Sequence, residues 1–354
     1  MTEVNLLHIS SSPHIRNSRT VPKIMLDVII ALMPAMVGAV MFFGVRALFI
    51  TLLAVATAVI TEHIISVFMM KRKTSIGDLS AVITGILLAF NLPVAISPLL
   101  VIVGTVFAIG VAKMAFGGLG CNFINPALAG RAFLMASYPA AMTGSIFAQN
   151  VSGGFVNIHL SGFKLDTVSS AIAIDGISEA TPLAALNILQ NAGINLQVLQ
   201  EALVPLFWGN VGGTIGETSA FALLLGGIYL ILRKVIHPIV PLIYIGGIFL
   251  IYWLFSGSNA SLFNATALTI PTFHILSGGI FLAAFFMITD MTTTPITIKG
   301  QALFAAGCAV ITVLIRSFGG YPEGASYAIL FMNLLTPLID RYVRPKVYGT
   351  GGKK

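Results

Sequence analysis

Apolar runs of about 20 residues recur along the whole of this chain, and they limit its fold more than any other feature. A helix needs about 20 mainly apolar residues to cross a hydrocarbon core about 30 Å thick. Backbone N–H and C=O groups find no water inside the lipid, so the segments that cross it must be helical rather than irregular. The sequence therefore predicts an all-α protein that crosses the membrane many times.

The composition supports a membrane protein and argues against several other classes. Hydrophobic residues make up 57% of the 354 residues and charged residues only 9%, whereas soluble domains carry about 25% charged residues. The net charge is +7, but the basic residues do not cluster with aromatic residues between them, so we expect no nucleic-acid partner. Cys121 and Cys308 stand alone and the histidines have no ligand-like spacing, so we expect no metal site.

Ten apolar segments are predicted to be transmembrane helices. They are residues 24–44, 45–70, 79–92, 97–116, 122–140, 213–232, 236–255, 275–288, 301–317 and 325–339. The predicted organisation is an N-terminal arm (1–23), a first five-helix repeat (24–140), a loop (141–212), a second five-helix repeat (213–342) and a tail (343–354). The arm has no apolar core before a cleavage site, so we expect no removable signal peptide.

The basic residues predict the topology. With the N-terminus in the cytoplasm, fifteen lysines and arginines fall in inside segments, and only Arg46, Lys164 and Arg316 fall outside. Loops rich in lysine and arginine stay in the cytoplasm. We therefore expect both termini to be cytoplasmic and the loop at 141–212 to be external.

The loop divides the predicted helices into five and five, and an odd number in each half requires that any repeat be inverted. Residues 116–118 and 318–320 both read Phe-Gly-Gly, before the fifth and the tenth helix. The third and eighth helices are short and end at 91–93 and 290–295, each closing on a proline. Broken helices at matching places indicate a binding site near the membrane midplane. Packing of small residues is the alternative interpretation.

Charges inside the predicted spans are candidates for function, because they are costly there. Asp27, Glu62 and Glu217 lie near helix ends, where we expect hydration and a structural role. Arg131 lies deeper, and it could contact a cofactor or pair with a carboxylate. Asp290 could line a cation path, contact a flavin edge or cap a helix end.

The loop carries a motif with its own chemistry. Thr181 is followed by a proline and an Ala/Leu run, which is typical of a helix N-cap. The same stretch is similar to Asp-x-x-Ser/Thr-Gly-Ala-Thr/Ser, on which a flavin transferase esterifies the phosphate of FMN to the last hydroxyl residue. Here the matching positions are Asp175, Ser178, Ala180 and Thr181, and Glu179 stands where glycine is usual.

This motif, the ten segments and the Gly-Leu-Gly-Cys-Asn-Phe-Ile-Asn-Pro-Ala-Leu-Ala-Gly-Arg stretch at 118–131 carry a family resemblance. Over essentially its whole length the chain resembles the family of the D subunit of the Rnf complex. This family also contains the B subunit of the sodium-pumping NADH:quinone oxidoreductase. The resemblance implies a flavoprotein of a prokaryotic inner membrane, in a translocase that couples electron transport to Na⁺ or H⁺ transport.

The resemblance also implies cofactors and partners. FMN would be covalently attached to Thr181, which makes the chain a phosphoprotein, and a helix N-terminus there would favour the phosphate. A second, non-covalent flavin, riboflavin, is implied, and we expect it at the two broken helices. The implied partners are the other Rnf subunits (the flavoprotein G-type, iron–sulfur and membrane A/E-type subunits) and the flavin transferase. The candidate flavin-binding residues within the helical halves are Asn91, Asn122, Asn125, Arg131, Asp290 and Thr292.

Two other functions remain open at this stage. The chain could be the B-type subunit of the sodium-pumping NADH:quinone oxidoreductase, in which a quinone is the electron acceptor. It could also be a channel or transporter for small solutes, because inverted halves with broken helices are typical of such pathways. As a subunit of either redox complex, the chain is not catalytically complete alone.

Overall fold

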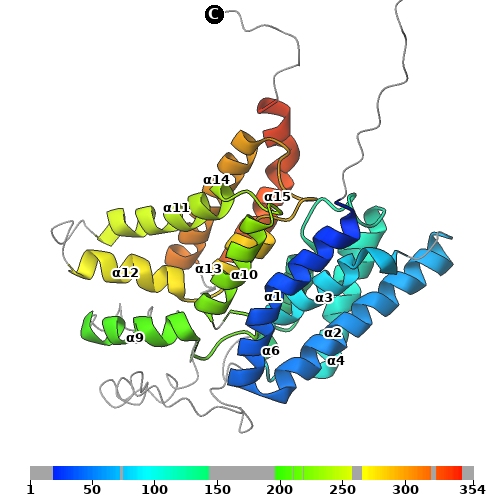
Figure 1. The fold of residues 1–354 in the computed structure, drawn as a ribbon, viewed down its shortest axis with the longest axis horizontal. Coiled ribbons are helices and arrows are strands. Elements are labelled where there is room, and N and C mark those ends of the chain that lie inside the picture. Colours follow the sequence, from blue (N-terminus) through cyan, green and yellow to red (C-terminus); the bar gives the residue numbers. More distant parts are fainter. Residues whose placement is uncertain are drawn as a thin grey trace, which may run out of the picture.

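The computed structural model describes residues 19–71, 75–142, 196–209, 211–217, 219–256, 265–319 and 324–344, and Figure 1 shows their arrangement. Over these residues the secondary structure is helical, and Pro93 and Thr214 form an isolated antiparallel bridge. The prediction of an all-α protein is confirmed for the described part of the chain.

The first half is built from long helices at its start and shorter, interrupted ones after them. Gly44, with a φ of 75°, ends the first helix and leads directly into the second. The elements are α1 (Val21–Phe43), α2 (Val45–Ile64), η1 (Ile65–Met69), η2 (Ile76–Asp78), α3 (Ser80–Phe90), α4 (Pro98–Phe107), η3 (Ala108–Lys113), η4 (Met114–Phe116), α5 (Pro126–Ser137) and α6 (Pro139–Met142).

The second half repeats this mixture of long and short helices. Its elements are α9 (Leu196–Trp208), α10 (Ala220–Leu232), α11 (Ile239–Ser256), α12 (Ala265–Leu276), α13 (Ile280–Leu282), η8 (Ala283–Met287), α14 (Ile298–Phe318) and α15 (Ala325–Tyr342). Each of the ten apolar segments predicted from the sequence contains at least part of one of these helices.

Several helices are long and apolar enough to cross a membrane. Among the described residues these are Val21–Phe43, Val45–Met69, Pro98–Phe116 and Ile298–Phe318. Leu268–Leu276 and Ile280–Met287 would form one more span, bent by 68° at a short break. The prediction of a multi-pass membrane protein is thus supported, whereas the number of ten crossings stays a prediction, because other apolar helices are shorter.

One helix lies where the sequence predicted none, and another extends beyond its predicted segment. α9 falls within the predicted external loop, and α12 begins well before the predicted start of the eighth helix. Leu199, Ala202 and Leu206 of α9 pack against Phe273 of α12. Their spacing of three and four residues is that of one helix face, but only the partner helix shows that this face is buried.

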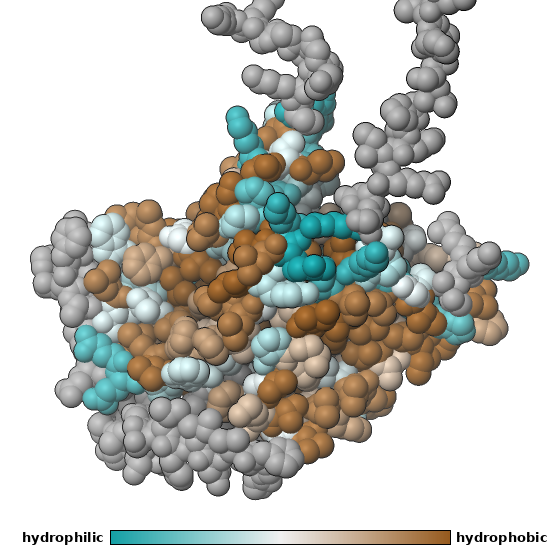
Figure 2. Space-filling model, in the orientation of Figure 1, coloured by the Kyte–Doolittle hydropathy of each residue, from teal (hydrophilic) through white to brown (hydrophobic). Residues whose placement is uncertain are grey.

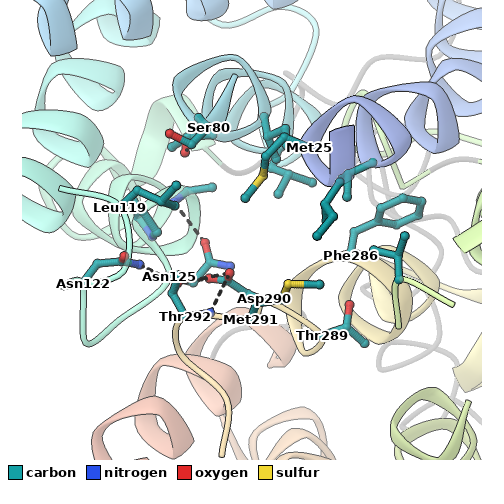
Figure 3. A pocket seen from close by; sticks show the side chains of 18 of the residues that line it. Met25, Ser80, Leu119, Asn122, Asn125, Phe286, Thr289, Asp290, Met291 and Thr292 are labelled. Atoms are coloured by element: carbon teal, nitrogen blue, oxygen red, sulfur yellow. Dashed lines mark hydrogen bonds between the residues drawn. The ribbon is translucent and has the colours of Figure 1, made fainter. Parts of the chain in front are cut away.

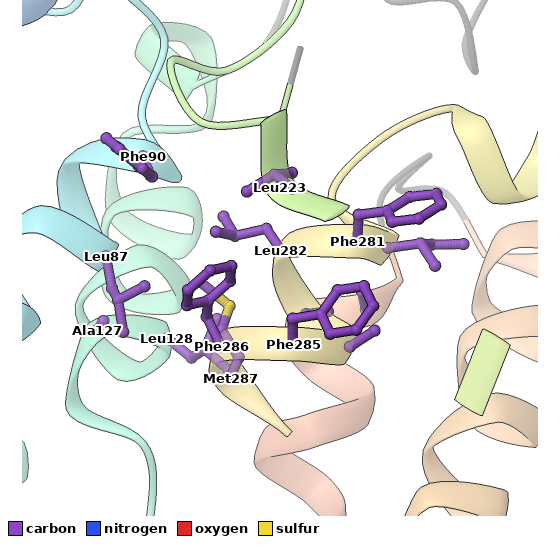
Figure 4. Close-up of a cluster of buried hydrophobic side chains, with 14 of the residues drawn as sticks. Leu87, Phe90, Ala127, Leu128, Leu223, Phe281, Leu282, Phe285, Phe286 and Met287 are labelled. Carbon is purple, nitrogen blue, oxygen red and sulfur yellow. The ribbon is translucent and has the colours of Figure 1, made fainter. Parts of the chain in front are cut away.

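The core joins the two halves. Figure 4 shows Leu87 of α3 beside Phe286 of η8, and Phe90, Leu223 of α10 and Met287 belong to the same buried cluster. The side-chain nitrogen of Asn91, just after α3, lies 3.9 Å from the sulfur of Met287. The two short helices that the sequence marked as interrupted therefore meet in the middle of the protein.

The ends of the helical body lie on one side of the molecule. In Figure 1 the start of α1 and the end of α15 both lie toward the upper side. Figure 2 shows hydrophilic residues gathered near that side and a broad hydrophobic surface below them. This arrangement is the one expected if a membrane surrounds the hydrophobic part and both ends emerge on the same face.

Close packing of α1 on α10 provides a test of the fold. A methyl group added at Gly226 of α10 would collide with the backbone carbonyl of Ala31, whereas one added at Gly246 of α11 would meet nothing within 4 Å. We expect Gly226→Ala to destabilise the protein by about 1–3 kcal/mol, the usual effect of overpacking. Gly246→Ala, the matched control, should not destabilise it. Melting midpoints in detergent measure both, and equal midpoints would contradict the α1–α10 contact.

Candidate functional site

A pocket lies where the two halves meet. Its cavity volume is about 100 Å³, and it is open on one side. Apolar side chains, among them Met25 of α1, Leu119 before α5 and Phe286 of η8, cover much of its wall. Figure 3 shows Asn122, Asn125, Asp290 and Thr292 close together, with Ser80 farther along the wall and Thr289 apart from them. Thr84 and Lys113 also line the pocket.

The turn that follows η8 is organised by Asp290. The hydroxyl of Thr292 donates to the Asp290 carboxylate at 3.1 Å, and the hydroxyl of Thr293 donates at 3.2 Å. The backbone N–H of Thr292 adds a third hydrogen bond of 3.3 Å. Asp290 therefore holds its own turn at the pocket, which agrees with the helix-end interpretation of this residue.

Asn122 connects the first half to this turn. Its side-chain nitrogen donates to the hydroxyl of Thr292 at 3.0 Å. Its side-chain oxygen is buried and accepts no hydrogen bond from the described residues. Since a buried acceptor without a donor is unfavourable, Asn122 offers a ligand in the pocket one hydrogen-bond acceptor.

Asn125 has a local structural role. Its side-chain oxygen accepts hydrogen bonds from the backbone N–H groups of Ala127 and Leu128, at 3.1 and 3.3 Å. Pro126 occupies the first position of α5, where no N–H is needed. Asn125 thus caps α5 and fixes where this helix begins at the pocket.

Lys113 differs from its sequence-based assignment. The sequence predicts a cytoplasmic positive charge at this position, but the side chain is only 2% exposed. Its ammonium group lies 2.6 Å from the Glu62 carboxylate and 2.6 Å from the Ser80 hydroxyl. The expectation that Glu62 is hydrated is also wrong, because the Glu62 side chain is 1% exposed and pairs with Lys113. The structure thus has a buried ion pair at one wall of the pocket, where the sequence predicted two hydrated charges.

A second buried network surrounds Arg131 of α5. One of its guanidinium nitrogens donates to the side-chain oxygen of Asn91 at 2.7 Å, to the hydroxyl of Ser326 at 2.9 Å and to Glu217 at 3.2 Å. Arg131 therefore pairs with a carboxylate, one of the two roles left open by the sequence. Glu217 is buried, so its predicted hydration is also wrong. The four residues come from four segments and connect both halves.

The break between α12 and α13 lies beside this network. Buried Arg316 donates to the carbonyls of His274 and Ser277, at 2.7 and 3.1 Å, at the C-terminal end of α12. A methyl group at Gly279, before α13, would collide with the carboxylate of Glu217. A cation thus contacts the negative end of one short helix and an anion lies at the positive end of the next. The sequence assigned Arg316 to an outside segment, and the structure shows that its side chain is buried.

The predicted site residues fall into three groups. Asn122, Asn125, Asp290 and Thr292 lie together at the pocket. Asn91 and Arg131 lie together in the buried network. The proposed attachment motif lies outside the described residues, namely Asp175, Ser178, Ala180 and Thr181.

Sequence reasoning did not select several polar residues of the site. Lys113, Ser80 and Ser326 contribute side chains to the pocket or the network. A signal was present for Lys113, because it lies inside a predicted span, where a charge calls for a partner. No such signal exists for the serines, because a hydroxyl in an apolar helix usually bonds its own backbone.

Comparison with known proteins finds one family along nearly the whole chain. Residues 8–349 match the model of the NQR2, RnfD, RnfE family. The chain is 43% identical over 351 residues to the D subunit of the Na(+)-translocating ferredoxin:NAD(+) oxidoreductase complex of Acetobacterium woodii. This match covers 99% of this chain and 97% of the relative.

Two further relatives show the same full-length similarity. The D subunit of the proton-translocating ferredoxin:NAD(+) oxidoreductase complex of Clostridium ljungdahlii is 43% identical, over 98% of this chain and 97% of its own. The D subunit of the ion-translocating oxidoreductase complex of Salmonella paratyphi B is 36% identical, over 97% of this chain and 99% of its own. The names of these relatives place them in ion-translocating oxidoreductase complexes.

The Arg131 network predicts that the stability of the protein depends strongly on the pairing of Arg131 with Glu217. We expect Arg131→Met to destabilise the protein by about 3–5 kcal/mol, because it leaves Glu217 buried without its partner. Adding Glu217→Gln to Arg131→Met should recover part of this loss, because the unpaired charge is then removed. Melting midpoints of the single and double variants in detergent measure the coupling.

An exposed ion pair gives the control for this cycle. Arg233 pairs with Asp27 at 3.1 Å, but its side chain is 57% exposed. We expect Arg233→Met to lower the melting midpoint much less than Arg131→Met does, because solvent screens an exposed ion pair. If Arg131→Met and Arg233→Met lower the melting midpoint equally, the buried network around Arg131 contributes no more to stability than an exposed ion pair.

Proposed function

This chain belongs to the NQR2, RnfD, RnfE family, and from that premise we propose that it is the D-type membrane subunit of an Rnf ion-translocating ferredoxin:NAD⁺ oxidoreductase complex. In that role it carries electrons by means of bound flavins, and the complex couples this transport to Na⁺ or H⁺ movement. The observation that supports the proposal best is the similarity to the D subunits of such complexes over nearly the whole chain.

We place the covalent FMN on Thr181. Support comes from the sequence of the loop, where Asp175, Ser178, Ala180 and Thr181 match the transferase motif. Thr181 precedes a proline and an apolar run, so it is suited to cap a helix whose free N–H groups favour a phosphate. The covalent bond would keep the flavin at the membrane surface by raising its effective concentration.

We place the second flavin, riboflavin, in the pocket between the halves. An isoalloxazine ring needs apolar faces and a few polar groups at its edge, and the pocket offers both. Phe285 and Phe286 line it together with Met25, and the free side-chain oxygen of Asn122 can accept from a ring or ribityl donor. When bound, the flavin supplies electron-transfer chemistry, while this chain positions it and excludes water.

The two halves are proposed to be inverted repeats. In the first half, Lys113 at the end of η3 bonds Ser80 at the start of α3. In the second half, Arg316 near the end of α14 bonds Ser277, just before α13. A basic residue from the fourth helix thus reaches the beginning of the short third helix in each half, as an internal repeat predicts.

The proposed topology has both termini in the cytoplasm and the Thr181 loop on the external side of a prokaryotic inner membrane. The excess of lysine and arginine in the inside segments supports this orientation. Lys113 and Arg316 are buried, so the inside and the outside segments each lose one basic residue. The inside segments still hold far more lysines and arginines than the outside segments. The pocket then opens toward the cytoplasm, and the Arg131 network lies on the external side of it.

The chain needs partner subunits for the reaction of the complex. It holds only Cys121 and Cys308, too few to ligate an iron–sulfur cluster. We therefore propose that iron–sulfur, flavoprotein G-type and membrane A/E-type subunits complete the electron path, and that a flavin transferase loads Thr181.

Flavin attachment can be tested directly. The chain, produced in a host with the transferase, should give a band that fluoresces under ultraviolet light on a denaturing gel. We expect Thr181→Val to abolish this fluorescence, because no hydroxyl remains to form the phosphoester. Thr167→Val, in the same loop, should retain it. A wild-type band without fluorescence would favour the channel or transporter alternative.

The pocket can be tested by its flavin content. Acid precipitation of the wild-type protein should release about one riboflavin per chain, separately from the covalent FMN. We expect Asn122→Ala to release several-fold less, because the acceptor and the bond to Thr292 are both lost. Thr57→Val, which removes a local hydrogen bond in α2, should release as much as wild type.

Covalent fluorescence serves as the folding control in the same samples. Full riboflavin content in both Asn122→Ala and Thr292→Val would contradict this location, and absence of released flavin from wild type would contradict a second flavin altogether. In either case the attachment of FMN to Thr181 would still be decided by the fluorescence of the gel band.

A further inference from the structure

A second cavity lies beside the pocket, within the second half. We call it the lateral groove. It has a volume of about 680 Å³ and lies between the α10–α11 connection and the segment that leads into α14. Its lining residues include Ile231, Lys234, His237, Ile288, Ile298 and Phe304. We call Lys234 and His237 its basic end, and the other lining residues are mainly aliphatic, with Phe304, Thr289, Thr294 and Gln301 among them.

Two side chains make the basic end. Lys234 has an exposed side chain and a left-handed backbone with a φ of 54°, and its carbonyl accepts from Arg19 at 3.2 Å. His237 accepts a hydrogen bond from the backbone N–H of Ile239 through Nδ1, at 3.3 Å. A neutral histidine that accepts at one nitrogen carries its proton on the other. Lys234 and His237 therefore both present donors at this end.

The beginning of α14 also lines the lateral groove, through Ile298 and Gln301 of its first turn. At the rim, the carboxylate of Asp340 accepts from the backbone N–H of Ile296 at 3.1 Å. An anion would therefore settle at the Lys234 end and away from Asp340.

We propose that the lateral groove binds one anionic phospholipid, with the phosphate at Lys234 and His237 and an acyl chain along Ile231, Met291 and Ile298. Basic pockets between transmembrane helices at the cytoplasmic surface suit anionic head groups. The apolar lining requires a ligand with a tail, which a free phosphate does not have. The cytoplasmic side follows from the proposed topology, whereas the amphipathic lining comes from the groove itself.

The bound lipid would support the pocket between the halves. Val235, Ile236, Thr289 and Met291 line both the pocket and the lateral groove. These residues form a shared wall, so an acyl chain in the groove packs on the outer side of that wall. Lipid binding does not depend on the nature of the pocket ligand, and it can be measured without a flavin.

Native mass spectrometry of the purified, delipidated chain tests this site. We expect one phosphatidylglycerol to bind, and phosphatidylcholine with the same acyl chains to bind at least about fivefold more weakly. Lys234→Asn should weaken phosphatidylglycerol binding about fivefold, the effect of one lysine near a membrane surface. Asparagine suits the left-handed backbone at this position, so the fold should be retained. Ile298→Trp should weaken binding by filling the apolar part.

Lys71→Asn is the matched control, because Lys71 is also exposed, has a φ of 50° and does not line the groove. This variant should bind phosphatidylglycerol as wild type does. The proposal is overturned if Lys71→Asn and Lys234→Asn weaken binding equally, or if phosphatidylcholine binds as tightly. It is also overturned if glycerol phosphate alone matches the lipid, since the groove would then be a site for free phosphate.

Discussion

A buried arginine sets the conditions that the rest of this structure has to meet. Arg131 lies in the protein interior, where an unpaired guanidinium would be strongly unfavourable. It is stabilised by an amide, a hydroxyl and a carboxylate from Asn91, Ser326 and Glu217. Because these partners come from both halves, the halves cannot shift freely without leaving a charge unpaired. The network thereby fixes how α3, α5 and α15 approach one another.

The same electrostatic logic explains the broken helices. A helix that stops inside the protein leaves free carbonyls at its end, and the next helix begins with free N–H groups. Arg316 supplies donors to the carbonyls of α12, and Glu217 lies at the start of α13. In the first half, Lys113 and Glu62 are paired beside the start of α3. Interruptions in an apolar span are thus tolerated where buried side-chain charges replace water.

Function is proposed at positions that these interruptions create. The pocket between the halves opens where α3 and α5 begin and where η8 ends, so its polar groups come from helix ends and its apolar groups from helix sides. The lateral groove shares one wall with it and combines basic and apolar groups in the same way. A flavin and a phospholipid both have a polar and an apolar part. Both proposed ligands therefore match the composition of their cavities.

The sequence by itself determined the solvent in which this protein folds, because long apolar runs leave no alternative to membrane helices. It also marked the interruptions after Asn91 and at Asp290, and the loop motif ending at Thr181, since proline and hydroxyl residues act locally. Only the tertiary structure decided which charges are buried, because Glu62 and Arg316 lie near helix ends that look hydrated until their partners are known. Partners from distant segments have no local signal, so the pairing of Arg131 with Glu217 had to come from the fold.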